Sequence, residues 1–203
     1  MYYCCLHFYL TGRPCSAFES MKEILPFEHF THEFYESEEF DSGQAARADI
    51  ILANLMEKDC RKTLQALLAG KKPKARLILL AGKEQILTIE DCLGEVCDVW
   101  VMPMSDAEAK FRFQKLQHEQ RMEKDYWQTS HYLESTINNI PNLVWYKDKN
   151  GIHEKVNDSF CKTVNKTKQQ VQGRGHAYIW DVEHDDPACI ESEKEVMTMR
   201  KSC

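Results

Sequence analysis

Cysteine and histidine are the residues of this sequence with the chemistry to bind a metal or act as nucleophiles. The chain has nine cysteines and eight histidines among 203 residues. Cys4 and Cys5 are adjacent rather than spaced as zinc ligands, and Cys92 and Cys97 have no second close pair. The number of cysteines is odd and no export signal precedes them, so we expect reduced thiols rather than a disulfide framework. These spacings therefore predict no metal site.

A second group of candidate site residues is aromatic and lies in the last third of the chain. These side chains could line a small-molecule pocket or form the core of a small domain, and they are Trp145, Tyr146, Phe160, His176 and Trp180. His176 and Cys189 have the chemistry of haem or redox ligands. A histidine beside glycine and aromatic residues more often makes a structural hydrogen bond, so we predict no cofactor.

The overall composition is that of an ordinary globular protein, with 43% hydrophobic and 29% charged residues. A net charge of -6 gives no concentrated basic surface for nucleic acid. The densest basic stretch, Lys71–Arg76, is short and typical of a solvated turn. No apolar run approaches the ~20 residues of a membrane span. We expect a cytoplasmic protein that binds neither nucleic acid nor membrane.

The first half of the chain must supply the framework for any site, and it alternates short apolar runs with amphipathic stretches. The apolar runs predict strands at Tyr2–Leu10, Thr31–Tyr35, Asp49–Leu55, Arg76–Ala81 and Val99–Met102. The stretches between them predict helices at Ser16–Leu25, with a possible Ser cap, and at Ser42–Arg47, Cys60–Ala69 and Thr88–Val96. The last three strands are apolar on both faces, which favours a parallel sheet covered by helices on both sides.

The segment Ala48–Asp59, the strand Ala75–Ala81 and the segment Val101–Ser105 together resemble strands three to five of the receiver domain of two-component signalling. This resemblance implies a flavodoxin-like fold with a five-stranded parallel sheet in residues 1–104. Receivers carry a phosphate-accepting Asp at the end of strand three, metal-binding acids after strand one, and a hydroxyl residue and a Lys nearby.

The resemblance places unreactive residues at these positions. Asn54 takes the place of the acceptor Asp, and an amide has no anionic oxygen to attack phosphorus. Leu80 replaces the hydroxyl residue and Met102 replaces the Lys. No acid follows the first strand before Glu19, and we interpret Glu57 and Asp59 as solvated loop residues. The sequence therefore predicts a pseudo-receiver whose pocket lacks acids and catalytic groups.

A long helix is predicted over residues 105–139. Ser105 is a plausible cap, and neither Gly nor Pro follows until Pro141. An apolar stripe of Ala109, Phe113 and Leu116 is expected to pack on the sheet. A second stripe has the four-then-three spacing of a coiled-coil seam and predicts a parallel homodimer; it comprises Met122, Tyr126, Thr129 and Leu133. The alternative is an amphipathic helix that packs within one chain.

Residues 140–203 begin with a predicted hairpin. Asn150 and Gly151 lie between two strand-like runs, and Asp158 and Ser159 open a short helix. A further helix is predicted over 165–172 and another at Glu191–Arg200. Trp145–Asp148, Val156-Asn157, Phe160-Cys161 and Gly173–His176 resemble the start of a bacterial PAS sensor domain, which implies an α+β fold able to take a small-molecule ligand. Because a PAS fold closes with three more strands, we expect a C-terminally truncated domain.

The arrangement resembles the N-terminus of bacterial diguanylate cyclases of the GGDEF type and of sensor histidine kinases. It implies a non-catalytic regulatory and dimerisation module that controls an output domain, a diguanylate cyclase or alternatively a histidine kinase. A third alternative is a flavodoxin-like enzyme domain that binds a ligand such as a flavin phosphate. That chemistry needs a Ser/Thr/Gly-rich loop after the first strand, and Thr11–Pro14 is poor in such residues.

Overall fold

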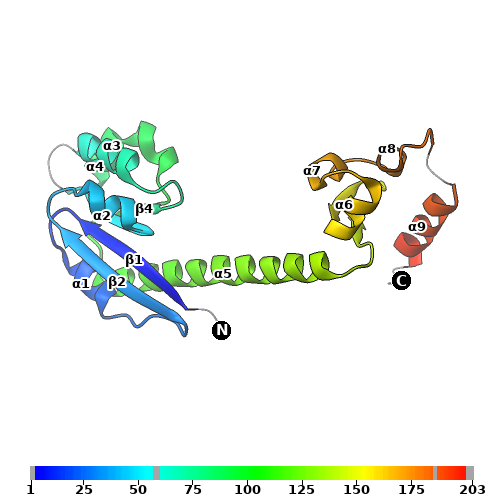
Figure 1. The fold of residues 1–203 in the computed structure, drawn as a ribbon. Helices are drawn as coiled ribbons and strands as arrows, with labels where there is room; N and C mark the ends of the chain where they lie inside the picture. Colours follow the sequence, from blue (N-terminus) through cyan, green and yellow to red (C-terminus); the bar gives the residue numbers. More distant parts are fainter. Residues whose placement is uncertain (1–2, 57–59, 185–186, 200–203) are drawn as a thin grey trace. The chain divides into compact units, whose positions relative to one another are not determined.

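The computed structural model describes residues 3–56, 60–184 and 187–199 (Figure 1). The chain divides into two compact units, Met1–Glu123 and Lys124–Cys203. None of the described helices is both long enough and apolar enough to cross a lipid bilayer.

The first unit contains a five-stranded parallel sheet in the order β2-β1-β3-β4-β5. The strands are β1 Cys4–Thr11, β2 Phe30–Ser37, β3 Ile50–Asn54, β4 Arg76–Ala81 and β5 Asp98–Val101. This order is that of the flavodoxin-like fold, in which the chain reverses its direction of winding between β1 and β3. The predicted fold class of this half of the chain is confirmed.

Helices cover both faces of the sheet, as the apolar strands require. One face packs against α1 (Ser16–Lys22) and the start of α5 (Asp106–Asn139), and its helical core residues include Phe18, Met21, Ala109, Phe113 and Leu116. The other face packs against α2 (Ser42–Arg47) and α3 (Cys60–Gly70) through Ala45, Leu64 and Leu67 (Figure 1). The predicted packing of the first α5 stripe on the sheet is therefore confirmed.

Several predicted element bounds differ from the structure. The helix predicted at Thr88–Val96 is a 3-10 helix over Glu90–Glu95, and a helix that was not predicted, α4, occupies Lys83–Thr88. Thr88 Oγ1 donates to the Gln85 carbonyl oxygen at 2.7 Å, within the last turn of α4. The residue that caps α1 is Cys15 rather than Ser16, and it makes no side-chain cap bond. Tyr2 and Arg200, at the ends of two predicted elements, lie outside the described residues.

His32 of β2 lies in an aromatic cluster on the α1/α5 face. Its ring centroid is 5.0 Å from that of Phe8, 6.0 Å from that of Phe34 and 5.9 Å from that of Phe113. The His32 Nδ1 atom is buried without a hydrogen-bond partner among the described residues. Burial lowers the pKa of His32 to about 4 from 6.5 because the protonated ring has little water or counter-charge.

We therefore expect the first unit to lose stability in mild acid. Between these two pKa values the unfolded chain binds a proton that the folded chain excludes. The His32 contribution is complete above about pH 6.5 and declines as the pH falls toward 4. From about pH 7.5 to about pH 5 the free energy of unfolding should drop by about 2 kcal/mol. Urea unfolding followed by tryptophan fluorescence measures this loss, in a background in which Trp127, Trp145 and Trp180 are replaced by Phe so that the buried Trp100 is the reporter.

Replacing His32 by Phe should remove that part of the pH dependence. His118 on α5 is exposed, so His118→Phe is the matched control and should keep the wild-type dependence. A His32→Phe variant whose stability falls with pH as steeply as the wild type would contradict the assignment.

The second unit is built from a small hairpin and short helices. Its strands are β6 Trp145–Lys147 and β7 His153–Val156, which pair in antiparallel fashion as predicted. The helices α6 Asp158–Val164, α7 Lys168–Val171, α8 His176–Trp180 and α9 Pro187–Met199 follow. The buried core comprises Val156, Phe160, Val164, Val171 and Ile179. This core is small, so polar contacts contribute a large share of the order in this unit.

Candidate functional site

The carboxyl edge of the first unit's sheet holds a cavity of about 270 Å³. It lies where β1 and β3 end, which is the winding-reversal point at which ligands bind in open α/β sheets. Three segments line it: the end of β1 with its loop, the loop after β2, and the β3–α3 region. The lining residues are Thr11, Gly12, Arg13, Glu38, Glu39, Phe40, Ala53, Asn54, Leu55, Cys60 and Thr63.

Asn54, the last residue of β3, is held by backbone groups on both sides of its amide. Its Nδ2 donates to the Arg13 carbonyl oxygen at 2.7 Å, and its Oδ1 accepts from the Met56 amide at 3.2 Å. The residue is only 8% exposed. Asn54 therefore fastens the loop after β1 to the end of β3, and this bond uses the N–H donor that an aspartate lacks.

Gly12 allows this close approach. It has a φ of +90°, and a Cβ at this position would collide with the Asn54 carbonyl oxygen. A residue with a side chain would meet both the steric contact and the strain of a positive φ. The loop geometry that presents the Arg13 carbonyl to Asn54 consequently depends on glycine.

Two acids in the cavity correct the expectation that this pocket has none. Glu38 and Glu39 follow β2 and line the cavity beside Asn54. Their loop is anchored by the buried Tyr9, whose hydroxyl bonds Ser37 Oγ at 2.7 Å and accepts from the Asp41 amide at 2.7 Å. Both glutamates follow the second strand, whereas the expectation rested on the residues after the first strand. Because β2 lies beside β1 in a flavodoxin-like sheet, the residues after β2 reach the same edge, and this neighbourhood is the signal that could have identified Glu38 and Glu39.

The other two positions that the receiver resemblance singles out do not contribute to the cavity lining. Leu80 is the strand partner of Asn54 in β4 and is fully buried in the core. Met102 is partly buried against the same core, after β5. Glu57 and Asp59 lie outside the described residues. The cavity thus combines an immobilised amide, an arginine and two glutamates.

In the second unit, the Phe160 ring contacts two other residues of the predicted aromatic pocket. Its ring centroid is 5.8 Å from that of Trp145 and 6.0 Å from that of Trp180, and Trp180 is 5.9 Å from His176. Phe160 is 1% exposed, whereas Trp145 is 48% and Trp180 39% exposed. Among the described ring contacts, Tyr146 takes no part in this set. The structure therefore forms an aromatic cluster from four of the five predicted residues.

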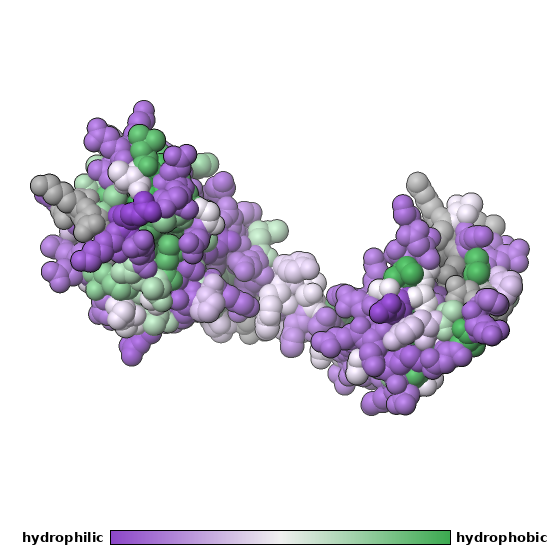
Figure 2. All heavy atoms as spheres, turned by 90° about the horizontal axis from the view of Figure 1, so that it is seen from above, coloured by the Kyte–Doolittle hydropathy of each residue, from purple (hydrophilic) through white to green (hydrophobic). Residues whose placement is uncertain are grey.

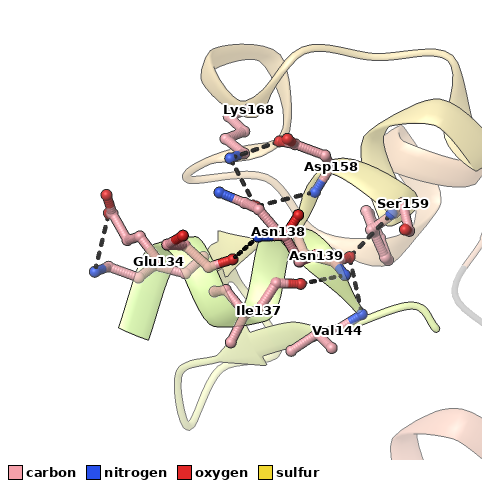
Figure 3. A network of polar contacts seen from close by, with 12 residues as sticks. Glu134, Ile137, Asn138, Asn139, Val144, Asp158, Ser159 and Lys168 are labelled. Carbon is pink, nitrogen blue, oxygen red and sulfur yellow. Dashed lines mark hydrogen bonds and ion pairs between the residues drawn. The ribbon is translucent and has the colours of Figure 1, made fainter. Parts of the chain in front are cut away.

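A cavity of about 250 Å³ in the second unit is lined by a different set of side chains. They are Glu134, Ile137, Asn138, Glu154, Lys155, Val156, Lys168, Val171 and Gln172. At its rim, Lys168 Nζ lies 2.7 Å from Asp158 Oδ1 and donates to Asn138 Oδ1 at 3.0 Å (Figure 3). This cavity was not anticipated because its walls combine the end of α5 with β7 and α7.

Asn157 is the polar centre of the second unit. It is 0% exposed, and its Nδ2 donates to three carbonyl oxygens, those of Ile137 (2.9 Å), Ile140 (3.3 Å) and Asn142 (2.8 Å). Its Oδ1 accepts from the amides of Val144 (3.1 Å) and Phe160 (3.0 Å), so it caps α6. One side chain thus joins the end of α5 to the hairpin and to α6.

The second stripe of α5 is exposed in the single chain. Met122 is 57%, Tyr126 76% and Leu133 50% exposed, and Thr129 is also exposed. Apolar side chains are also visible among polar ones on the face drawn in Figure 2. Exposed large apolar residues at a regular helical spacing are typical of an interaction surface.

The strand order and the cavity at the carboxyl edge define the first unit as a flavodoxin-like α/β domain, with the amide of Asn54 at the end of β3. No family model and no curated protein matches the chain.

Solved structures similar to the chain include the REC domain of AraT, a response regulator from Geobacillus stearothermophilus. It is 15% identical over 59% of this chain and 98% of that chain, with a TM-score of 0.44. An adenylate cyclase from Rhodopirellula baltica is 15% identical over 61% of this chain and 96% of that chain, with a TM-score of 0.41. The pilus assembly protein CpaE from Caulobacter crescentus CB15 is 10% identical over 55% and 92%, with a TM-score of 0.40.

Proposed function

We propose that this chain is a non-catalytic regulatory module of a bacterial signal-transduction protein. It forms a homodimer through α5 and transmits the state of its two units to an output domain. In this proposal the protein is cytoplasmic, the first unit is a pseudo-receiver, and the second is the N-terminal part of a PAS domain.

The observation that carries the proposal is the fixed amide of Asn54. Phosphoryl transfer to a sheet-edge residue needs an anionic oxygen and a bound divalent cation. Asn54 supplies neither, and its amide is already bonded to the backbone of Arg13 and Met56. The two glutamates of the cavity also disfavour an anionic phosphate ligand, which weakens the flavin-phosphate alternative.

The second unit supports a sensory role through its connection to α5. Asn157 bonds the carbonyl oxygen of Ile137 in α5 and also caps α6. A ligand in the adjoining cavity would touch Ile137 and Asn138 of α5 together with Val156 of β7. Binding there would favour one arrangement of the helix end over another, which is the requirement for transmitting a signal.

The dimer is tested by placing charge in the exposed stripe of α5. Wild-type chain should scatter light with a mass near twice 23.8 kDa, whereas Leu133→Glu and Tyr126→Glu should each weaken association by about 100-fold or more, since a buried unpaired charge is costly. Size-exclusion chromatography with light scattering at several concentrations measures this change.

Gln128→Glu is the matched control, because it adds the same charge to α5 outside the four-then-three seam. It should leave the dimer intact. A wild-type chain that scatters as a single 23.8 kDa species at every concentration would refute the dimer. If Gln128→Glu weakened association as much as Leu133→Glu does, the four-then-three stripe would not be the dimer contact.

We further propose a diguanylate cyclase as the output domain, with a histidine kinase as the alternative. Both rest on the resemblance of the receiver-helix-PAS order to the N-terminal regions of such proteins. The coding sequence after the codon for Cys203 distinguishes them, since a GGDEF motif supports the first and a kinase core the second.

A further inference from the structure

The amino-terminal part of β1 brings together ligand atoms that sequence spacing did not reveal. Cys5 and His7 are two residues apart on β1 and therefore point to the same face of the sheet. Glu33 of β2 is the direct strand partner of His7. The Cys5 thiol, a His7 ring nitrogen and a Glu33 carboxylate oxygen all lie within 4.8 Å of one another. Among residues 3–56, 60–184 and 187–199, this is the only three-residue group of Cys, His, Asp or Glu with that property.

The distances suit a small tetrahedral ion. Zinc bonds of about 2.0 Å to nitrogen or oxygen and about 2.3 Å to sulfur place tetrahedral ligand atoms roughly 3.3–3.6 Å apart. His7 Nε2 lies 3.5 Å from Glu33 Oε2. These two groups thus have the required separation already, and the Cys5 thiol lies within 4.8 Å of both.

Neighbouring side chains hold two of the ligands in the orientation a metal requires. His7 Nδ1 is 3.1 Å from Asp49 Oδ2, and Asp49 Oδ2 also accepts from the His7 backbone amide at 3.0 Å. A proton on Nδ1 leaves the lone pair of Nε2 directed toward Glu33. Tyr35 donates its hydroxyl to Glu33 Oε2 at 3.1 Å. A carboxylate behind a histidine and a donor behind a ligating carboxylate are typical of metal centres.

Asp49 is itself fixed by a cation. Lys72 Nζ donates to Asp49 Oδ1 at 3.0 Å, so the carboxylate that orients His7 is bonded at both oxygens. The His7 side chain is 35% and the Glu33 side chain 54% exposed, which gives an ion access from solvent.

We propose that Cys5, His7 and Glu33 bind one zinc ion, with Asp49 as a positioning residue. A thiolate and an imidazole favour zinc over magnesium or calcium, which prefer oxygen ligands. Three protein ligands leave a fourth position for water or an exogenous group. The ion bridges β1 and β2 near their first residues, whereas Asn54 and its cavity lie at the carboxyl edge of the sheet. The site is therefore independent of the pseudo-receiver cavity.

The test is a calorimetric titration of the chelator-treated full chain with zinc chloride alone under a non-thiol reductant. One ion per chain should bind, and Cys5→Ser, His7→Gln or Glu33→Gln should each weaken that binding by about 100-fold or more. Asp49→Asn should weaken it by about 10–100-fold. Cobalt added in place of zinc should give a thiolate charge-transfer band that Cys5→Ser abolishes.

Cys4→Ser is the matched control, because Cys4 is adjacent in sequence and packs against the core on the opposite face of the sheet. It should bind zinc like the wild type. Circular dichroism of each variant identifies any that fails to fold. The cobalt–thiolate band of the folded Asp49→Asn variant gives a second measurement of metal binding. The proposal is overturned if the wild type binds no zinc, or if Cys5→Ser binds as tightly as Cys4→Ser.

Discussion

Replacing Asn157 by Asp is expected to unfold the second unit at neutral pH. The substitution keeps the oxygen that accepts from Val144 and Phe160, but it removes the N–H groups that reach three carbonyl oxygens. In their place stands a fully buried carboxylate that faces those carbonyls. Unmade buried bonds cost about 1–3 kcal/mol each, and an uncompensated buried charge adds more. We expect a total loss of about 4 kcal/mol, which a core of this size cannot compensate.

Hydrogen exchange followed by mass spectrometry measures this effect unit by unit. Amides of β7 and α6 should lose their protection in Asn157→Asp, while those of β3 and β4 should keep it, because the two units have separate cores. Asn142→Asp introduces the same charge at an exposed side chain and should leave protection unchanged. Retained protection of α6 in Asn157→Asp would show that the network does not hold the unit together.

The sequence predicted the sheet of the first unit because its strands are apolar on both faces. Each such strand is a short run of apolar residues, which can be recognised without knowing what the strand contacts. β3 shows the reason most clearly: all five of its residues are buried, which only a central strand allows. The ends of some elements differ from the prediction. The helix predicted at Thr88–Val96 is preceded in the structure by α4, which opens with the polar residues Lys83 and Glu84 and shows little apolar periodicity.

The site geometry depends on contacts between residues far apart in sequence. Asn54 and Arg13 are separated by 41 positions, and the bond between them uses a backbone carbonyl that carries no sequence signature. Glu33 lies beside His7 because β2 pairs with β1 in the register that makes these two residues strand partners. The sequence alone does not select this register from its neighbours. The coiled-coil seam, in contrast, is a local pattern. Its residues were identified from spacing alone, and their exposure agrees with that pattern without testing the dimer.

Changing Asn54 to Asp should destabilise the first unit without creating a phosphoryl acceptor. The new carboxylate would face the Arg13 carbonyl oxygen at the 2.7 Å distance that the amide bond now occupies. Two oxygen acceptors at this separation repel, and the Arg13 carbonyl loses its donor, so we expect a loss of about 2–3 kcal/mol. Urea unfolding followed by Trp100 fluorescence measures it, with Asn142→Asp as the control of equal charge.

The same variant should remain unmodified by acetyl phosphate and Mg²⁺. An aspartyl phosphate needs a metal ion beside the acceptor and polar groups that stabilise the transferring phosphoryl group, and Leu80 and Met102 stand where the receiver resemblance places the hydroxyl residue and the Lys. The cavity acids Glu38 and Glu39 are the groups beside residue 54 that could hold Mg²⁺. Intact-mass spectrometry should show no phosphoryl adduct on Asn54→Asp beyond that on wild type. Stable incorporation would mean that those glutamates bind Mg²⁺ after all, and the first unit would then be one substitution away from an active receiver rather than a module specialised for contact.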